Sequence, residues 1–191
     1  MKLHISLYEP IGLNSVLCKS SIGLLLLILG GCATAPIPLN YAPSSTLTAS
    51  GAVSVSDFKY LPAENGKVAA NQIKNTAIGN AYFDQPIAKF YRDAVFKELR
   101  FVGVKMDDKN RVLSGDIDEF LIDDLGFHVD WTLQVHYVVT NTQTNKIIYD
   151  SVKTTKRETA KFVGTEAALN ETVRLNIDDL IKDPGFIKAI N

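Results

Sequence analysis

The chain has 191 residues, of which 46% are hydrophobic, and its formal net charge at neutral pH is −1. This length allows one domain with a proper hydrophobic core, and the hydrophobic content is ordinary for a globular protein. The balanced charge gives no support for nucleic-acid binding, which needs clustered basic residues in excess. We therefore expect one folded domain and no nucleic-acid partner.

An apolar run near the N-terminus, Ile22 to Leu29, is followed directly by Gly30-Gly31-Cys32. The run is too short to span a bilayer, which takes about 20 apolar residues, but it has the length of the hydrophobic region of a signal peptide. Two small residues before the cysteine leave the backbone open to a signal peptidase. Leu29-Gly30-Gly31-Cys32 resembles the lipobox of bacterial lipoproteins, so we expect cleavage between Gly31 and Cys32.

The lipobox resemblance implies that residues 1–31 are removed and that the Cys32 thiol carries covalent lipid. Two or three acyl chains, palmitate among them, would tether the protein permanently, because one chain alone binds a membrane only marginally. The alternatives are an ordinary secretory signal with an incidental cysteine and an uncleaved N-terminal anchor. Since Cys18 lies in the removed segment, no thiol would remain for a disulfide, a metal or a nucleophile, and we expect no cofactor apart from this lipid.

The residue after Cys32 bears on the destination of the protein. In lipoproteins of many Gram-negative bacteria, Asp at this position retains the protein in the inner membrane, and here the position is Ala33. We therefore expect a protein anchored in the outer membrane and facing the periplasm. Residues 32–50 are rich in Pro, Ser and Thr and are predicted to form the lipidated N-terminus and a flexible linker, with a root-mean-square span of about 20–25 Å. Residues 51–191 are then a single periplasmic domain.

Hydrophobic periodicity divides this domain into six main elements. It predicts strands over 52–60, 111–123, 127–141 and 146–159, and helices over 85–101 and 164–182. In the first strand Val53, Val55 and Asp57 share one face, and in the first helix Glu98 is the only polar residue on the apolar stripe. The apolar tail after the second helix, 186–190, is expected to dock back on the domain.

Two of the strands carry further detail. In 111–123 the apolar residues change parity after Ile117, which predicts a β-bulge near Asp118 and Glu119. In 127–141 Trp131 lies on the apolar parity, whereas His128 and His136 lie on the polar parity, as in a sheet that is covered on one side. The fold class is therefore α+β: a two-layer sandwich of order β-α-β-β-β-α, with a largely antiparallel four-stranded sheet covered on one face by two helices.

Two segments carry a family resemblance, namely Phe96-Lys97-Glu98-Leu99-Arg100-Phe101-Val102-Gly103 and Leu113-Ser114-Gly115-Asp116-Ile117-Asp118-Glu119-Phe120. Together with the lipobox they resemble the YajG-type bacterial lipoproteins and, more distantly, the auxiliary lipoproteins of ABC-type lipid transporters. This resemblance implies a role in the cell envelope and brings no catalytic residues with it.

Candidate chemistry outside the lipobox is weak. His128 and His136 are eight residues apart on one strand, about 26 Å, which is too far for one metal ion. The acidic residues Asp116, Asp118, Glu119, Asp123 and Asp124 could act in acid–base catalysis or hold Ca²⁺, but at a bulge and a turn they also fit a solvated sheet edge. We predict no metal site and no enzymatic activity.

A basic stretch, Lys153 to Lys161, could meet lipid phosphates or an acidic partner, although such a run is more often a solvated face. The segment Leu61–Asp84 has weak periodicity and reads as a long loop, which in a compact domain is often functional. We expect a protein partner to bind there, through apolar residues that have no periodic face to join: Ile73, Ile78, Tyr82 and Phe83. The alternative is that Ile78, Tyr82 and Phe83 simply close the end of the sandwich.

Two functions from different classes follow. The first is an outer-membrane lipoprotein that acts as a non-enzymatic accessory or scaffold component in envelope assembly or lipid transport, through contacts with an envelope protein. The alternative is a periplasmic binding module that holds a lipid or another small apolar ligand between the segment Leu61–Asp84 and the sheet.

Overall fold

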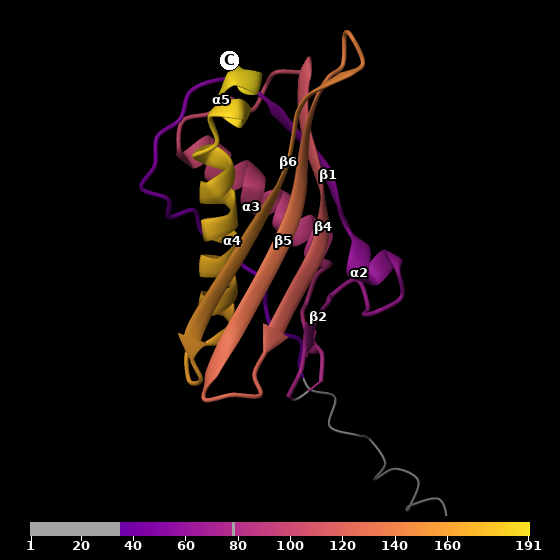
Figure 1. Cartoon of the computed structure of the whole chain (residues 1–191), viewed down its shortest axis with the longest axis vertical. Helices are drawn as coiled ribbons and strands as arrows, with labels where there is room; N and C mark the ends of the chain where they lie inside the picture. Colours follow the sequence, from indigo (N-terminus) through magenta and orange to yellow (C-terminus); the bar gives the residue numbers. More distant parts are fainter. Residues whose placement is uncertain (1–34, 78) are drawn as a thin grey trace, which may run out of the picture. The chain divides into compact units, whose positions relative to one another are not determined.

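Three long antiparallel strands form the centre of this computed structural model, which describes residues 35–77 and 79–191 (Figure 1). They are β4 (Arg111–Asp123), β5 (His128–Asn141) and β6 (Lys146–Ala160), paired in that order. The side chains of β5 alternate as predicted, since every second residue from Val129 to Val139 is buried. Trp131 is 3% exposed, so its place in the core is confirmed.

The predicted bulge in β4 is confirmed. The register of the β4–β5 pairing shifts between Ile117 and Glu119, and both Ile117 and Phe120 are buried as a result. Between these two strands Gly115 is needed for space, because a Cβ there would lie 2.6 Å from the carbonyl oxygen of His136 and 2.7 Å from the ring of Phe58.

The outer edge of β4 holds more strands than the sequence predicted. First β1 (Ser54–Tyr60) pairs with β4 in parallel, and then β2 (Gln72–Asn75) does so further along the same edge. A short helix, α2 (Leu61–Glu64), begins the connection between them, and β3 (Ala81–Tyr82) pairs with β2. The sheet therefore has six strands, and the expected loop over Leu61–Asp84 is wrong, because α2, β2 and β3 form within it and Ile73 and Phe83 are buried.

The buried side chains of the first strand also differ from the prediction. A register shift between Val55 and Phe58 turns the chain by one residue, so that Phe58 and Tyr60 enter the core while Asp57 is exposed. Asp57 therefore does not share the buried face of Val53, as period-two alternation had predicted.

The long helices α3 (Ile87–Phe101) and α4 (Thr165–Ile181) cover one face of the sheet, which confirms the two-layer α+β sandwich. Helix α3 packs on β1, and α4 packs on β5 and β6 (Figure 1). The tail forms a third helix, α5 (Pro184–Ile190), whose residues Phe186 and Ile190 are fully buried. The expectation that the tail docks is confirmed.

A buried polar cluster joins the two helices to the sheet. The hydroxyls of Tyr91 in α3 and Tyr137 in β5 contact each other, and both donate to the side-chain oxygen of Asn176 in α4, at 2.8 Å. The Asn176 amide nitrogen donates to the Thr155 hydroxyl at 3.1 Å. Because buried polar groups are costly when unpaired, this cluster fixes the position of α4 on the sheet.

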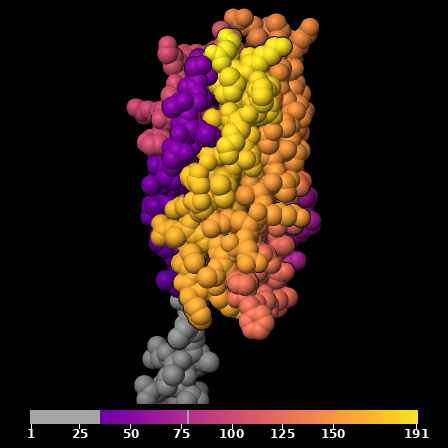
Figure 2. Space-filling model, turned by 60° about the vertical axis from the view of Figure 1, so that its left-hand side comes forward, coloured from indigo at the N-terminus to yellow at the C-terminus, as the bar shows by residue number. Residues whose placement is uncertain are grey.

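The N-terminal segment 36–50 is not a flexible linker, and the compact domain begins at Pro36. We call residues 36–50 the strap. The strap begins beside β3, where the Ile37 amide donates to the Tyr82 carbonyl at 2.8 Å, and it ends at the far end of α3, where the Ala49 amide donates to the Val102 carbonyl at 2.9 Å. Figure 2 shows this indigo segment lying along the yellow helices. Composition alone had suggested a linker, but the strap carries buried side chains.

Candidate functional site

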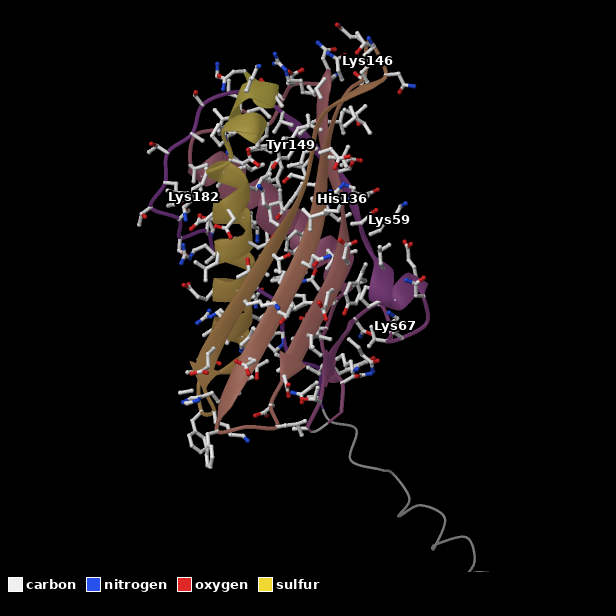
Figure 3. All side chains as sticks on the ribbon, viewed as in Figure 1. Lys59, Lys67, His136, Lys146, Tyr149 and Lys182 are labelled. Carbon is white, nitrogen blue, oxygen red and sulfur yellow. The ribbon has the colours of Figure 1, made fainter. Side chains whose placement is uncertain are left out.

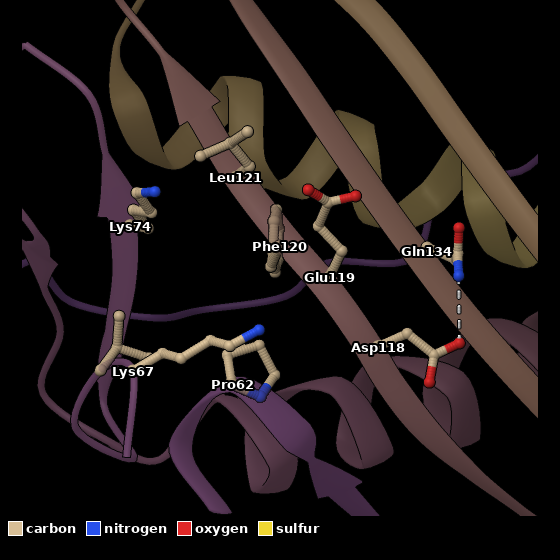
Figure 4. A pocket seen from close by; sticks show the side chains of 9 residues that line it. Pro62, Lys67, Lys74, Asp118, Glu119, Phe120, Leu121 and Gln134 are labelled. Atoms are coloured by element: carbon tan, nitrogen blue, oxygen red, sulfur yellow. Dashed lines mark hydrogen bonds between the residues drawn. The ribbon is translucent and has the colours of Figure 1, made fainter. Parts of the chain in front are cut away.

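A groove lies at the outer edge of β4, between the end of β1 and the start of β2 and beside the β-bulge of β4 (Figure 4). Its volume is about 330 Å³. It is thus situated between the segment Leu61–Asp84 and the sheet, the place expected for a ligand in the binding-module reading. The lining residues are Pro62, Lys67, Val68, Lys74, Asp118, Glu119, Phe120, Leu121 and Gln134.

The groove combines apolar surface with four charged side chains. Lys67 and Lys74 lie on one side of it, and Asp118 and Glu119 lie across from them on β4 (Figure 4). The Gln134 amide donates to the Asp118 carboxylate at 3.3 Å. Phe120 is 2% exposed, so its ring belongs to the core and offers little surface to a ligand. A site of this kind suits a polar ligand or a charged peptide better than an acyl chain.

The two histidines lie on the open face of the sheet, where they pair with acidic residues of β6. His136 contacts Asp150 at 2.8 Å, and His128 contacts Glu158 at 3.3 Å, so each histidine pairs across to β6 (Figure 3). Asp123 accepts a hydrogen bond from the Thr76 hydroxyl at 2.6 Å. Within residues 35–77 and 79–191 no three His, Cys, Asp or Glu side chains are placed to hold a metal ion.

The basic stretch of β6 is largely bound to the domain itself. The Lys153 ammonium lies 2.6 Å from the Asp183 carboxylate, and together with the Tyr149 hydroxyl and the Gly185 amide it lowers the pKa of Asp183 to about 2. The Arg157 guanidinium donates to the Ala168 carbonyl at 3.4 Å. These cations therefore hold α4 and α5 on β6, which leaves less charge for an acidic partner than the sequence suggests.

The partner-binding residues expected in the segment Leu61–Asp84 separate into two groups. Ile73 and Phe83 are fully buried, so as the domain stands they are core residues and present no surface to a partner. Tyr82 is 46% exposed and remains available. Ile78, like Gly31 and Cys32, lies outside the described residues. Ile73 is buried because β2 pairs with the edge of β4. No local sequence pattern predicts this pairing.

Sequence reasoning missed a group of exposed apolar residues at the end of the sheet where β4 ends and β5 begins. Leu125 and Phe127 lie in the β4–β5 turn and are 71% and 95% exposed. Phe162 and Val163 lie in the connection from β6 to α4 and are 99% and 46% exposed. A signal was present, since Leu125 lies in a segment predicted to turn, Phe127 begins the next predicted strand, and Phe162 and Val163 lie between a predicted strand and a predicted helix.

We call this end of the domain the loop end: residues 124–127 and 161–164, with the neighbouring β2–β3 turn. The Lys161 ammonium joins the first two segments, because it donates to the Gly126 carbonyl at 2.9 Å and lies 3.4 Å from the Asp124 carboxylate. The Thr76 hydroxyl, in the β2–β3 turn, accepts from the Asp124 amide at 3.1 Å. Across the described parts of the chain, no helix is long and apolar enough to cross a membrane.

Comparison with known proteins shows a similar fold in a solved structure and identifies no family for this chain. No protein-family model matches the chain, and no curated protein matches it. A solved structure of protein XCC0632 from Xanthomonas campestris, of the family DUF330, is similar with a TM-score of 0.63 at 12% identity, covering 81% of this chain and 96% of that one. At such identity the likeness shows a shared fold alone.

Weaker likenesses extend to other bacterial proteins. The hypothetical protein CT253 from Chlamydia trachomatis has a TM-score of 0.49 at 9% identity, covering 74% of this chain and 99% of that one. A minor lipoprotein from Acinetobacter baumannii has a TM-score of 0.37 at 16% identity, covering 73% and 92%. The structural neighbours thus include a DUF330 protein and a bacterial lipoprotein, and scores this low support no argument about function.

Proposed function

We propose that this protein is a lipid-anchored, non-enzymatic accessory component of the Gram-negative cell envelope, held by Cys32 in the outer membrane on its periplasmic face. The observation that carries the proposal is the short distance in sequence between the lipobox and the folded domain, which begins at Pro36. Four residues span at most about 14 Å. A lipid on Cys32 would therefore keep the domain near the membrane surface, within a shorter maximum distance than a flexible linker of 18 residues would impose.

The outer edge of β6 supports a role through protein contacts. β6 is the last strand of the sheet, so one side of its backbone has no strand partner among the described residues. Near its start Ile147, Ile148 and Val152 are 60%, 40% and 50% exposed. An exposed strand edge with apolar side chains is a template for an added strand from another protein. We propose that these contacts serve envelope assembly or lipid transport. A relation to the YajG-type lipoproteins is part of the same proposal.

Two experiments on native membranes test it. Cys32→Ser should release the domain into the soluble periplasmic fraction or leave an uncleaved precursor, and a processed Cys32→Ser protein that stays in the membrane would refute the anchor. A photo-crosslinking residue at Val152 should capture a membrane protein in stoichiometric yield, whereas the same residue at Phe101, which is 57% exposed on α3, should not. Equal capture at both positions would contradict a β6 interface.

The groove at the bulge of β4 supports the second candidate, a periplasmic binding module. Its position agrees with that reading, but its two lysines and two carboxylates favour a polar ligand over a lipid. Lys67→Ala with Lys74→Ala should then abolish retention of a co-purified small molecule, detected by mass spectrometry of the denatured protein. A lipid that co-purifies equally with both forms would place its binding elsewhere.

A further inference from the structure

The loop end exposes four apolar side chains within two short segments. Phe127 and Phe162 are almost completely exposed, and Leu125 and Val163 lie beside them in the same two short segments. Single exposed apolar residues are common on protein surfaces, but a group at one end of a domain marks a surface that contacts something apolar.

The two segments form one surface with almost no free charge. Residues 124–127 and 161–164 contain one acid and one base, Asp124 and Lys161, and these two are paired with each other. Lys161 also binds the backbone of the first segment through the Gly126 carbonyl. The phenyl rings of Phe127 and Phe162 therefore lie on two segments that the contacts of Lys161 connect. Figure 2 shows the β4–β5 turn projecting at the lower end of the domain.

The polypeptide enters the domain at this same end. Ile37 pairs with Phe83 in parallel, and β3 leads away from the β2–β3 turn, so residues 35 and 36, which precede Ile37, lie toward that turn. Along β2, Gln72 lies opposite Tyr82, and four residues later Thr76 contacts Asp123. This strand length is about 13 Å. The five residues from Cys32 to Ile37 extend over about 16 Å, which is enough for Cys32 to reach the level of the loop end.

From these observations we infer that the loop end is a membrane-docking surface whose phenyl rings insert into the interfacial region of the lipid bilayer that carries the Cys32 anchor. The inference rests on the proposed function for the anchor itself. A bilayer is the occupant that fits, because a lipid on Cys32 brings this end of the domain, rather than another, to the membrane. Phe and Leu side chains on the apolar face of interfacial segments are buried at the boundary between lipid headgroups and acyl chains.

The mode of docking follows from the composition of the surface. Since Asp124 neutralises Lys161, attraction to anionic lipids contributes little, and burial of apolar side chains provides the affinity. Docking should therefore occur on zwitterionic phosphatidylethanolamine as well as on anionic lipid, and it should change little as salt rises. With the end docked, the groove and the edge of β6 would be held in a fixed orientation to the membrane.

A single fluorescent label measures the docking on the lipidated protein. In the protein purified from membranes and reconstituted in phosphatidylethanolamine vesicles, Val163→Cys carries an environment-sensitive label beside Phe162. Its emission should shift to the blue and be quenched by spin-labelled lipids. The matched control is Phe101→Cys, another exposed position, which lies on α3 near the strap residue Ala49 at the opposite end of the domain and should not be quenched.

Two further arms make the test decisive. Phe127→Ser with Phe162→Ser should reduce quenching at Val163→Cys to the level of the control, while the fold stays intact because both side chains are exposed. Raising the salt concentration should leave quenching unchanged. Absence of quenching at Val163→Cys overturns the inference, and so does equal quenching at Phe101→Cys. Loss of a crosslinked protein in the double variant, without quenching in the parent, would assign the surface to a protein partner instead.

Mass spectrometry of the same samples separates this inference from the proposed function. Lipid found on Cys32 together with an unquenched label refutes docking and leaves the anchor standing. A quenched label with Cys32 unmodified refutes the anchor and leaves docking by the loop end standing.

Discussion

The Tyr41 hydroxyl donates a hydrogen bond to the buried carboxylate of Glu98, which lies 57 residues further along the chain. The other carboxylate oxygen accepts from the backbone amides of Ser44 and Ser45, at 3.1 and 2.6 Å. Glu98 is fully buried on the apolar stripe of α3, where a charged side chain is exceptional. Its place there is explained by the strap, because one carboxylate satisfies three donors of the N-terminal segment.

Glu98→Ala should therefore detach the strap. Three donors would lose their acceptor, and two of them, the Tyr41 hydroxyl and the Ser45 amide, are buried. Each buried donor costs about 1–3 kcal/mol when left unpaired, so we expect a loss of about 2–4 kcal/mol of unfolding free energy. Denaturant titration measures this loss, and limited proteolysis should show new cleavage in residues 41–47. Glu64→Ala, at an exposed position of α2, is the control and should behave like the parent. Unchanged protease resistance in Glu98→Ala would contradict the assigned role.

Trp131 and the two histidines of β5 should differ in their effect on stability. Trp131 is 3% exposed and its indole nitrogen donates to the Thr159 hydroxyl at 3.0 Å, so Trp131→Ala should cost about 3–5 kcal/mol. His128→Ala and His136→Ala remove only side chains of the open face and should each change the unfolding free energy by less than about 1 kcal/mol. Thermal unfolding of the three variants checks this order. The reverse order would show that the buried and open faces of β5 have been assigned wrongly.

The segment Leu61–Asp84 should prove structural at Ile73 and accessible at Tyr82. Ile73→Ala removes a fully buried side chain of β2 and should cost about 2–5 kcal/mol. Tyr82→Ser should leave the unfolding free energy nearly unchanged and, if this edge binds a partner, should weaken crosslinking to it. Replacement of residues 66–80 by a Gly/Ser linker deletes β2 and should unfold the domain, as circular dichroism would show. A folded, fully active replacement would exclude this segment from both roles.

Asp183 should make stability dependent on pH in the acid range. Contact with the Lys153 ammonium, with further hydrogen bonds from Tyr149 and Gly185, lowers the pKa of Asp183 in the folded state to about 2, from 3.8. A group whose pKa is lowered by folding stabilises fully above its unfolded pKa, and the contribution is lost as pH falls through the folded value. Asp183→Asn should thus cost about 1–2 kcal/mol near pH 7, and the difference should shrink between pH 4 and pH 2.

The control for this pH dependence is Asp179→Asn. Asp179 is 48% exposed and lies 4.0 Å from Lys182, so its loss should change the unfolding free energy little at any pH. Urea titrations of both variants at several pH values give the comparison. A cost for Asp183→Asn that persists unchanged at pH 2 would show that the charge of Asp183 is not its source.

Local patterning was sufficient for much of the fold. The alternation in β5, the bulge after Ile117, the end of the first long helix at Phe101 and the docking of the tail were all predicted correctly. Each of these depends on the spacing of residues within one element, or on a backbone preference such as the positive φ of Gly103. The lipobox before Cys32 is likewise a local signal, and it stays a prediction because the described residues begin after it.

Only the tertiary structure decided which irregular segments belong to the core. The strap resembled a linker in composition, and Ile73 and Phe83 resembled loop residues, because their partners lie far away in the sequence: Glu98 for the strap, and the edge of β4 for Ile73. The loop end depended on the fold in the same way. Phe127 and Phe162 become one surface only when β4, β5 and β6 bring their turns together, since exposure is set by neighbours in space, whereas periodicity reports only neighbours along the chain.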